Sequence, residues 1–137
     1  MRITLDTNVL IAAFVAKGLC HDLFAHCALQ HDLVTSQFIL DELRSKLFGK
    51  FRQSTSFVEG SIAIALTRMR IVEPSPLPEQ VCRDADDDWV LATAVAGSCD
   101  CLVTGDKDLL VLRSYSGIPI LSPRDFQAFE RDLNAKE

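Results

Sequence analysis

The sequence predicts an α/β fold in which a mainly parallel central sheet is covered by helices on both faces. Short apolar runs with the character of buried strands alternate along the chain with longer segments of helical pattern. Several of these strands lead directly into residues that begin helices. Because parallel neighbours need crossover connections, which are usually helices, this alternation favours parallel pairing.

The first half of the chain contains two strand-to-helix units and a further helix. In both units the strand ends at short polar residues that cap helices, Asp6-Thr7-Asn8 in the first and Ser36 in the second. The predicted elements are a strand at residues 3–5, helices at 9–15 and 20–29, a strand at 33–35, a helix carrying Leu40, Leu43 and Leu47, and a helix at 57–69.

The second half repeats this rhythm after a short proline-rich connection at residues 73–78. Acidic residues 84–88 precede an apolar helix at 89–96, which Gly97 can end. A strand at 101–104 turns at Gly105-Asp106, a last strand covers 119–121, and Ser122-Pro123 begins a terminal helix.

Length and composition favour one domain, residues 1–137, with a core of ordinary size. The 48% hydrophobic and 24% charged residues are typical of a soluble globular protein, and no apolar run is long enough to span a bilayer. An aspartate at position 6 interrupts the N-terminus before any signal-peptide pattern forms, so we expect a cytoplasmic protein. The net charge of −5 argues against a protein that grips nucleic acid mainly through a basic surface.

Neither the cysteines nor the histidines form a recognisable site. The five cysteines lack the Cys-x-x-Cys pairs of zinc ribbons and thioredoxin-like proteins, which favours buried thiols. His21, His26 and His31 recur every five residues, a spacing that does not place them on one helical face. We therefore assign them no catalytic role.

Carboxylates occur at four separate places that the predicted fold can bring to one edge of the sheet. Asp6 and Asp106 each follow a strand, at the edge where open parallel sheets bind ligands. Glu42 lies in the helix after the second strand, the acidic run 84–88 begins another helix, and Asp108 follows Asp106. Hard divalent cations such as Mg²⁺ prefer oxygen ligands of this kind, and a bound cation can receive a phosphate.

Each acid also has an ordinary structural explanation. Asp6 can simply cap a helix, and Glu42 can be a solvated helix residue. The run 84–88 suits the positive end of a helix dipole, and Asp106 suits a turn. Only tertiary folding decides between these explanations, because a group of acids in close proximity is stable only with a cation or with bound protons.

The segments that carry these acids resemble the PIN domain family, and in particular VapC-like toxins of bacterial toxin-antitoxin systems. The resemblance extends over nearly the whole chain and rests on the order and spacing of four segments. These are Asp6-Thr7-Asn8-Val9-Leu10, Asp41-Glu42-Leu43, residues 86–94 and residues 102–110. It implies a three-layer α/β/α sandwich and a metal-dependent nuclease that selects single strands, usually of RNA.

By resemblance, the catalytic acids are Asp6, Glu42, Asp87 and Asp106. Asp6, Asp87 and Asp106 are the expected ligands of Mg²⁺ or Mn²⁺, and Thr7, Asn8 and Thr104 match the small polar residues that support the ligands. Further candidate ligands are Glu42, Asp84, Asp88 and Asp108.

The expected partners are an RNA substrate, a cognate antitoxin and a second copy of the chain. Arg44, Lys46, Lys50 and Arg52 form the densest basic group and can bind backbone phosphates, although a solvated helix face explains them equally well. The apolar residues around Phe48, Phe51 and Phe57 can be buried in a homodimer or in the core of a monomer.

The function predicted from the sequence is therefore a metal-dependent ribonuclease that cleaves single-stranded RNA, acting as the toxin of a toxin-antitoxin pair. The main alternative is a non-catalytic PIN-like module that binds RNA or protein; the complete acidic set argues against it. A phosphatase or receiver-like domain with an aspartyl nucleophile also places an acid at a strand end, but it accounts poorly for residues 84–88.

Overall fold

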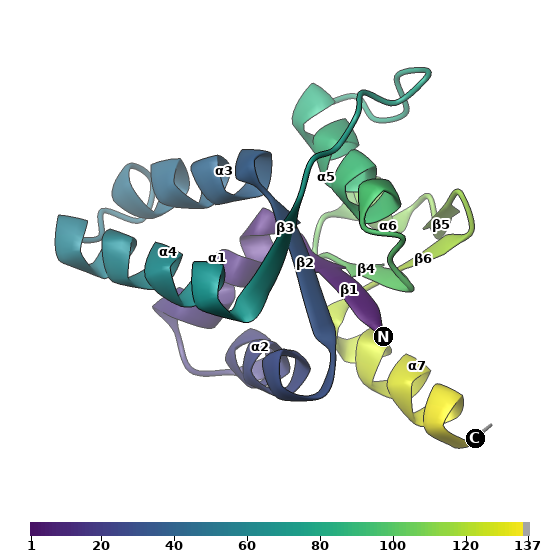
Figure 1. Cartoon of the computed structure of the whole chain (residues 1–137), viewed down its shortest axis with the longest axis horizontal. Helices are drawn as coiled ribbons and strands as arrows, with labels where there is room; N and C mark the ends of the chain where they lie inside the picture. Colours follow the sequence, from purple (N-terminus) through teal and green to yellow (C-terminus); the bar gives the residue numbers. More distant parts are fainter. Residues whose placement is uncertain (136–137) are drawn as a thin grey trace.

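The computed structural model describes residues 1–135, so the last two residues of the predicted domain 1–137 lie outside the described residues. Helices and strands alternate through most of the chain (Figure 1). In chain order they are β1 (Arg2–Leu5), α1 (Thr7–Val15), α2 (Leu19–Gln30), β2 (Asp32–Ser36), α3 (Gln37–Phe48), α4 (Thr55–Arg68), β3 (Met69–Val72), α5 (Ala85–Ala96), β4 (Cys101–Val103), α6 (Lys107–Leu110), β5 (Ser114–Tyr115), β6 (Ile118–Leu121) and α7 (Pro123–Ala135).

Within residues 1–135 the strands form one six-stranded sheet in the order β3-β2-β1-β4-β6-β5. All neighbours are parallel except β5 and β6, which pair in an antiparallel hairpin. In the register of the central strands Leu5 lies opposite Val103, so the residues that follow β1 and β4 emerge side by side. The prediction of a mainly parallel sheet is confirmed.

Helices cover both faces of the sheet. Ile3, Thr4 and Leu5 are all fully buried, which requires cover on both sides of β1 because successive side chains point to opposite faces. Helix α5 packs against β1, β2 and β4, whereas α2 and α7 lie on the other side of the strands (Figure 1). The arrangement is the expected three-layer α/β/α sandwich.

The local signals that begin and end helices are used as predicted. The side chains of Asp6, Ser36 and Asp84 accept hydrogen bonds from backbone N–H groups at the starts of α1, α3 and α5. Gly97 ends α5 and lies against β2, where an added Cβ would be 2.6 Å from Cγ1 of Val34.

Three short elements, β3, α6 and β5, were not predicted, and the predicted helix 57–69 is wrong at its C-terminal end. Helix α4 stops at Arg68, and Met69 begins β3 by pairing with Leu33. Long-range pairing with β2 therefore overrides the helical pattern at this position.

Within the described part of the chain, none of the helices is long and apolar enough to cross a membrane by itself. Helices α1 and α2 meet the length and composition criteria only as a pair, and the chain bends by 105° between them.

Candidate active site

Asp6 lies at the carboxyl end of β1 and is only 4% exposed. Its backbone N–H donates to the carbonyl of Val103 at 2.9 Å, which continues the pairing of β1 with β4. Its Oδ1 accepts the backbone N–H of Thr7 at 2.7 Å and so caps α1. The capping role considered from the sequence is real, but it uses only one of the two carboxylate oxygens.

Thr104 connects Asp6 to the loop that carries Asp106. The hydroxyl Oγ1 of Thr104 donates to Oδ2 of Asp6 at 2.7 Å and accepts the backbone N–H of Asp106 at 3.0 Å. Asp106 in turn caps the short helix α6 by accepting the backbone N–H of Asp108 at 2.8 Å. The buried Thr104 thus fixes Asp6 and the backbone of Asp106 relative to each other.

Asp87, in the first turn of α5, approaches this loop from a third segment. Carboxylate oxygens of Asp87, Asp106 and Asp108 all lie within 4.8 Å of one another. The pKa of Asp87 is raised to about 7, first by burial and then by the charges of Asp106, Asp6, Asp84 and Asp108. The fold therefore brings acids that are remote in sequence into one electrostatically coupled group.

Glu42 reaches the same group from α3. Burial raises the pKa of Asp6; the hydrogen bonds from Thr104 and Thr7 oppose this rise, and the charges of Glu42 and Asp106 add to it. The Glu42 side chain is 16% exposed, and its Oε1 lies 3.9 Å from the Lys46 ammonium one helical turn further along. Glu42 thus lies close enough to Asp6 to influence its ionisation.

The other acids of residues 84–88 have structural partners. Asp84 caps α5 by accepting the backbone N–H of Asp86 at 2.9 Å. Asp88 accepts the backbone N–H groups of Val81 and Cys82 at 3.0 and 2.8 Å and so fixes the loop before the helix. Of this run, only Asp87 belongs to the cluster of three carboxylates.

Asp108 is paired with a cation that the sequence analysis did not identify. The guanidinium of Arg83 donates to both carboxylate oxygens of Asp108 at 2.9 and 3.0 Å, and the Arg83 side chain is largely exposed. The two residues are 25 positions apart, so no local pattern indicates the pair.

The predicted supporting residues differ in their surroundings. Thr104 is fully buried and bonded as described, whereas Asn8 is exposed. Thr7 is fully buried, and its hydroxyl has no hydrogen-bond partner within residues 1–135.

The donor set fits a hard divalent cation. Every candidate ligand atom is a carboxylate oxygen, and burial together with the neighbouring negative charges raises the pKa of Asp87 to about 7, which a bound cation would oppose. Asp87, Asp106 and Asp108 present oxygens close enough to share one ion, and Asp6 adjoins them through Thr104.

The basic residues predicted to bind RNA lie on α3 and in the loop after it. Arg44 donates to Glu59 of α4 at 3.1 Å, and Lys46 lies near Glu42. The Lys50 ammonium lies 5.7 Å from the centre of the Phe51 ring. Arg52 is exposed.

The apolar residues considered for a dimer are only partly buried. Phe48 and Phe51 are 59% and 38% exposed, whereas Phe57 packs against the core. The dimer stays a prediction.

The chain is similar to known proteins in sequence pattern and in fold. The family model described as "PIN domain" matches residues 2–108, whereas no curated protein matches the sequence. One similar crystal structure is that of VapBC2 from Rickettsia felis bound to a DNA fragment from the VapBC2 promoter. The matching chain has 16% identity and a TM-score of 0.63 over 89% of this chain and 98% of that one.

Two further solved structures have similar scores. VapBC-1 from nontypeable Haemophilus influenzae has 17% identity and a TM-score of 0.63 over 90% of this chain and 99% of that one. Mycobacterium tuberculosis VapC20, a Sarcin-Ricin loop cleaving toxin, has 16% identity and a TM-score of 0.61 over 85% and 98%. At these identities the structural likeness shows the fold, and the family follows from the match over residues 2–108: the chain belongs to the PIN domain family.

Proposed function

We propose that this protein is a metal-dependent ribonuclease that cleaves single-stranded RNA and acts as the toxin of a toxin-antitoxin pair. The observation that carries the proposal is the convergence of Asp87, Asp106 and Asp108, whose oxygens lie within 4.8 Å of one another beside the buried Asp6. Membership of the PIN domain family supports a nuclease, and the similarity to VapC20, a Sarcin-Ricin loop cleaving toxin, supports RNA as substrate.

Electrostatics favour a metal centre over a purely structural group of acids. Burial and then the charges of the neighbouring carboxylates raise the pKa of Asp87 to about 7, and Arg83 compensates the charge of Asp108 alone. A bound Mg²⁺ or Mn²⁺ would supply Lewis acidity toward the phosphodiester and neutralise charge on its oxygens.

In this proposal the protein groups have distinct tasks. Asp6, Asp87 and Asp106 hold the cation, and Thr104 orients both Asp6 and the loop of Asp106 through its hydroxyl. Glu42 completes the ligand set or orients the attacking water, which its position near Asp6 permits. Asp6 suits its task because both of its carboxylate oxygens accept hydrogen bonds, which fix the orientation of the side chain.

Substrate binding needs positive charge beside the acids. Lys46 lies one turn after Glu42, and Lys50 and Arg52 continue the basic segment beyond the end of α3. We assign backbone-phosphate binding to these residues together with Arg44, whose guanidinium is held by Glu59 in the free protein.

The experiment is cleavage of a single-stranded RNA by the wild type, Asp6→Asn, Asp106→Asn and a matched control, Asp132→Asn, with Mn²⁺ or Mg²⁺. Asp132 is exposed on α7 and loses the same charge on substitution. We expect cleavage by the wild type and Asp132→Asn, no cleavage in EDTA, and a loss of at least about 100-fold in the two site variants. Equal cleavage by the wild type and Asp6→Asn would refute the mechanism.

The same assay separates the enzyme from a non-catalytic module. A wild-type protein that binds Mn²⁺ and RNA but leaves the RNA intact would support the binding module predicted as the alternative.

The proposed protein partner is a cognate antitoxin, because two of the similar structures are the VapBC complexes of Rickettsia felis and Haemophilus influenzae. A groove of about 630 Å³ between α1, α2 and α4 offers an apolar surface for it, lined by Phe14, Phe24, Leu29, Phe57 and Ile64 among others. Co-expression of the wild type and of the groove variant Ile64→Asp with a candidate antitoxin tests the assignment. Ile64 is 47% exposed, so the variant should fold and lose the complex.

A further inference from the structure

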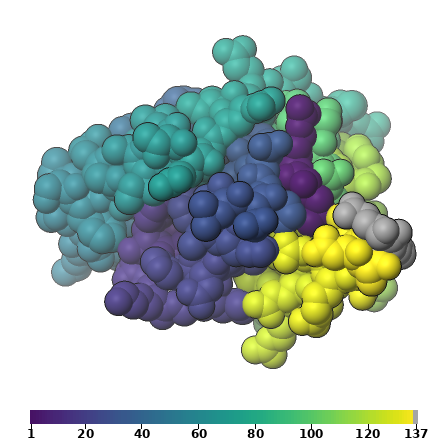
Figure 2. Space-filling view, turned by 60° about the horizontal axis from the view of Figure 1, so that its bottom comes forward, coloured from purple at the N-terminus to yellow at the C-terminus, as the bar shows by residue number. Residues whose placement is uncertain are grey.

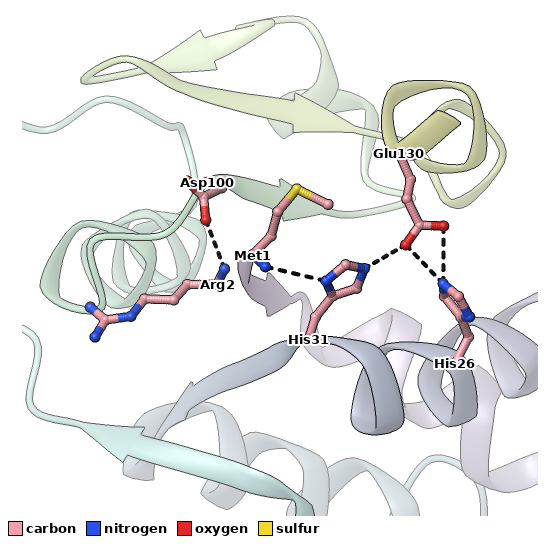
Figure 3. Close-up of polar contacts among 6 residues, drawn as sticks. All are labelled: Met1, Arg2, His26, His31, Asp100 and Glu130. Carbon is pink, nitrogen blue, oxygen red and sulfur yellow. Dashed lines mark hydrogen bonds and ion pairs between the residues drawn. The ribbon is translucent and has the colours of Figure 1, made fainter. Parts of the chain in front are cut away.

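A second cluster of metal-binding side chains lies at the opposite edge of the sheet from the acids. His26 belongs to α2, His31 directly follows that helix, and Glu130 belongs to α7 (Figure 3). The space-filling view shows α7, in yellow, against the indigo residues of α2 and the start of β2 (Figure 2). His31 precedes β2, whereas the acids follow the carboxyl ends of the strands.

The three side chains converge through their metal-binding atoms. Nε2 of His26 lies 2.8 and 3.0 Å from the two carboxylate oxygens of Glu130, and Nε2 of His31 contacts Oε2 of the same carboxylate. One ligand atom from each residue lies within 4.8 Å of the other two. Figure 3 shows both rings turned toward Glu130.

We propose that His26, His31 and Glu130 form a binding site for Zn²⁺ that joins α7 to α2. Two imidazole nitrogens and one carboxylate oxygen are a zinc-binding set, with the fourth position left for water. The site differs in chemistry from the acidic centre, whose all-oxygen ligands suit Mg²⁺ or Mn²⁺. The cluster is accessible from solvent, because the His26 side chain is 46% exposed.

Local structure explains how two histidines five residues apart share one site. Helix α2 ends at Gln30, and His31 adopts an extended conformation with φ −139° and ψ 176°. The chain therefore leaves the helical path before His31, and the spacing rule for a continuous helix does not apply to it. The His31 ring also packs edge-on against Phe126, one turn before Glu130 on α7, at 6.3 Å between centroids.

Zinc binding at the two Nε2 atoms would leave the ring protons of His26 and His31 on Nδ1, because only an imidazole nitrogen without a proton can bind the ion. Nδ1 of His31 lies 3.2 Å from the Met1 amine, so zinc binding would also change the hydrogen bond between these two groups. Atoms that bind one zinc ion lie farther apart than hydrogen-bonded atoms do, so zinc binding would require the three side chains to move apart.

The neighbouring residue Cys27 is fully buried, and its sulfur does not belong to the group of converging ligand atoms.

The test is calorimetric titration of the untagged full chain with ZnCl₂ in excess MgCl₂, which occupies the acidic centre. Two variants remove a ligand, His26→Ala at an exposed ring and Glu130→Gln with nearly unchanged shape. His21→Ala is the matched control, since His21 bonds the carbonyl of Ala13 outside the cluster. Asp106→Asn changes the acidic centre and leaves the histidine cluster intact. The zinc proposal is therefore tested separately from the proposed nuclease activity.

We expect one Zn²⁺ per chain in the wild type, His21→Ala and Asp106→Asn, and an affinity at least about 10-fold lower in His26→Ala and Glu130→Gln. With Co²⁺ as probe, the wild type should show the strong visible absorption of a tetrahedral site, and His26→Ala should not. The proposal is overturned if the wild type binds no Zn²⁺, if both ligand variants bind it as the wild type does, or if Asp106→Asn abolishes binding.

Discussion

The hydroxyl of Thr104 donates to Oδ2 of Asp6 at 2.7 Å and links this buried carboxylate to the backbone of Asp106. We expect Thr104→Val to lose both bonds at nearly constant volume. Leaving a buried carboxylate oxygen without its donor costs about 1–3 kcal/mol of unfolding free energy. Loss of the orienting contact should also weaken Mn²⁺ binding by about 10–100-fold. Urea denaturation and calorimetry measure the two effects.

Thr104→Ser provides the control, because it keeps the hydroxyl and loses only a methyl group. It should retain most of the Mn²⁺ affinity. If Thr104→Val binds Mn²⁺ as the wild type does, the threonine does not position Asp6.

Asp87 makes the metal-free protein sensitive to pH. Its pKa is raised to about 7 in the fold, whereas an unfolded aspartate titrates near 3.9. The folded state therefore binds the proton more tightly, and the resulting stability is present below about pH 4 and is lost as the pH rises through 7. In EDTA, the free energy of unfolding of Asp87→Asn relative to that of the wild type should rise by about 1–2 kcal/mol from pH 4.5 to pH 8. This value is smaller than the full pKa shift would give, because Asp87 is partly exposed.

The measurement is urea unfolding at the two pH values, with Asp132→Asn as the control for loss of a surface charge. Adding Mg²⁺ at pH 8 should stabilise the wild type and have little effect on Asp87→Asn. If wild type and Asp87→Asn differ in free energy of unfolding by the same amount at both pH values, the fold does not raise the pKa of Asp87.

The elements predicted correctly are those specified by local chemistry. Asp6, Ser36 and Asp84 begin helices where their side chains accept backbone N–H groups. Strand β3 was missed because it is an edge strand with Arg70 and Ile71 both exposed, so it lacks the alternation that indicates a half-buried strand. The strand forms because its backbone pairs with β2, and the sequence pattern of β3 itself does not indicate it.

The sites depend on contacts that no local pattern encodes. Asp6 and Thr104 meet because Leu5 and Val103 are paired in the sheet, 98 positions apart. Asp87 and Asp88 are chemically identical, and the fold distinguishes them: Asp88 accepts two backbone N–H groups of the preceding loop, whereas Asp87 lies close to Asp106 and Asp108. The histidine cluster was missed for the same reason, since Glu130 is remote from both histidines in the sequence.

Asp88 should be important for stability and not for metal binding. Its carboxylate accepts two backbone N–H groups, from Val81 and Cys82, and Asp88→Ala leaves both donors without their partner. We expect a loss of about 1–3 kcal/mol in urea unfolding, with Mn²⁺ affinity close to that of the wild type. Asp88→Asn, which keeps one acceptor oxygen, should lose less. A large loss of Mn²⁺ affinity in a folded Asp88→Asn would instead make this residue a ligand.

The basic segment after Glu42 should contribute to RNA affinity through charge. Lys46 and Lys50 lie on and just beyond α3, and replacing both by Gln removes two contacts to phosphates. Each contact to a single strand contributes about 0.7 to the slope of log affinity against log salt, so the double variant should lower the slope by about 1.4 and weaken binding several-fold. Binding is measured by fluorescence anisotropy in EDTA, which prevents cleavage.

The control replaces Lys17 and Arg131, two exposed residues away from α3 whose replacement removes the same charge. Because both double variants have the same net charge, an equal fall in slope would show that general attraction, and not this segment, binds the RNA.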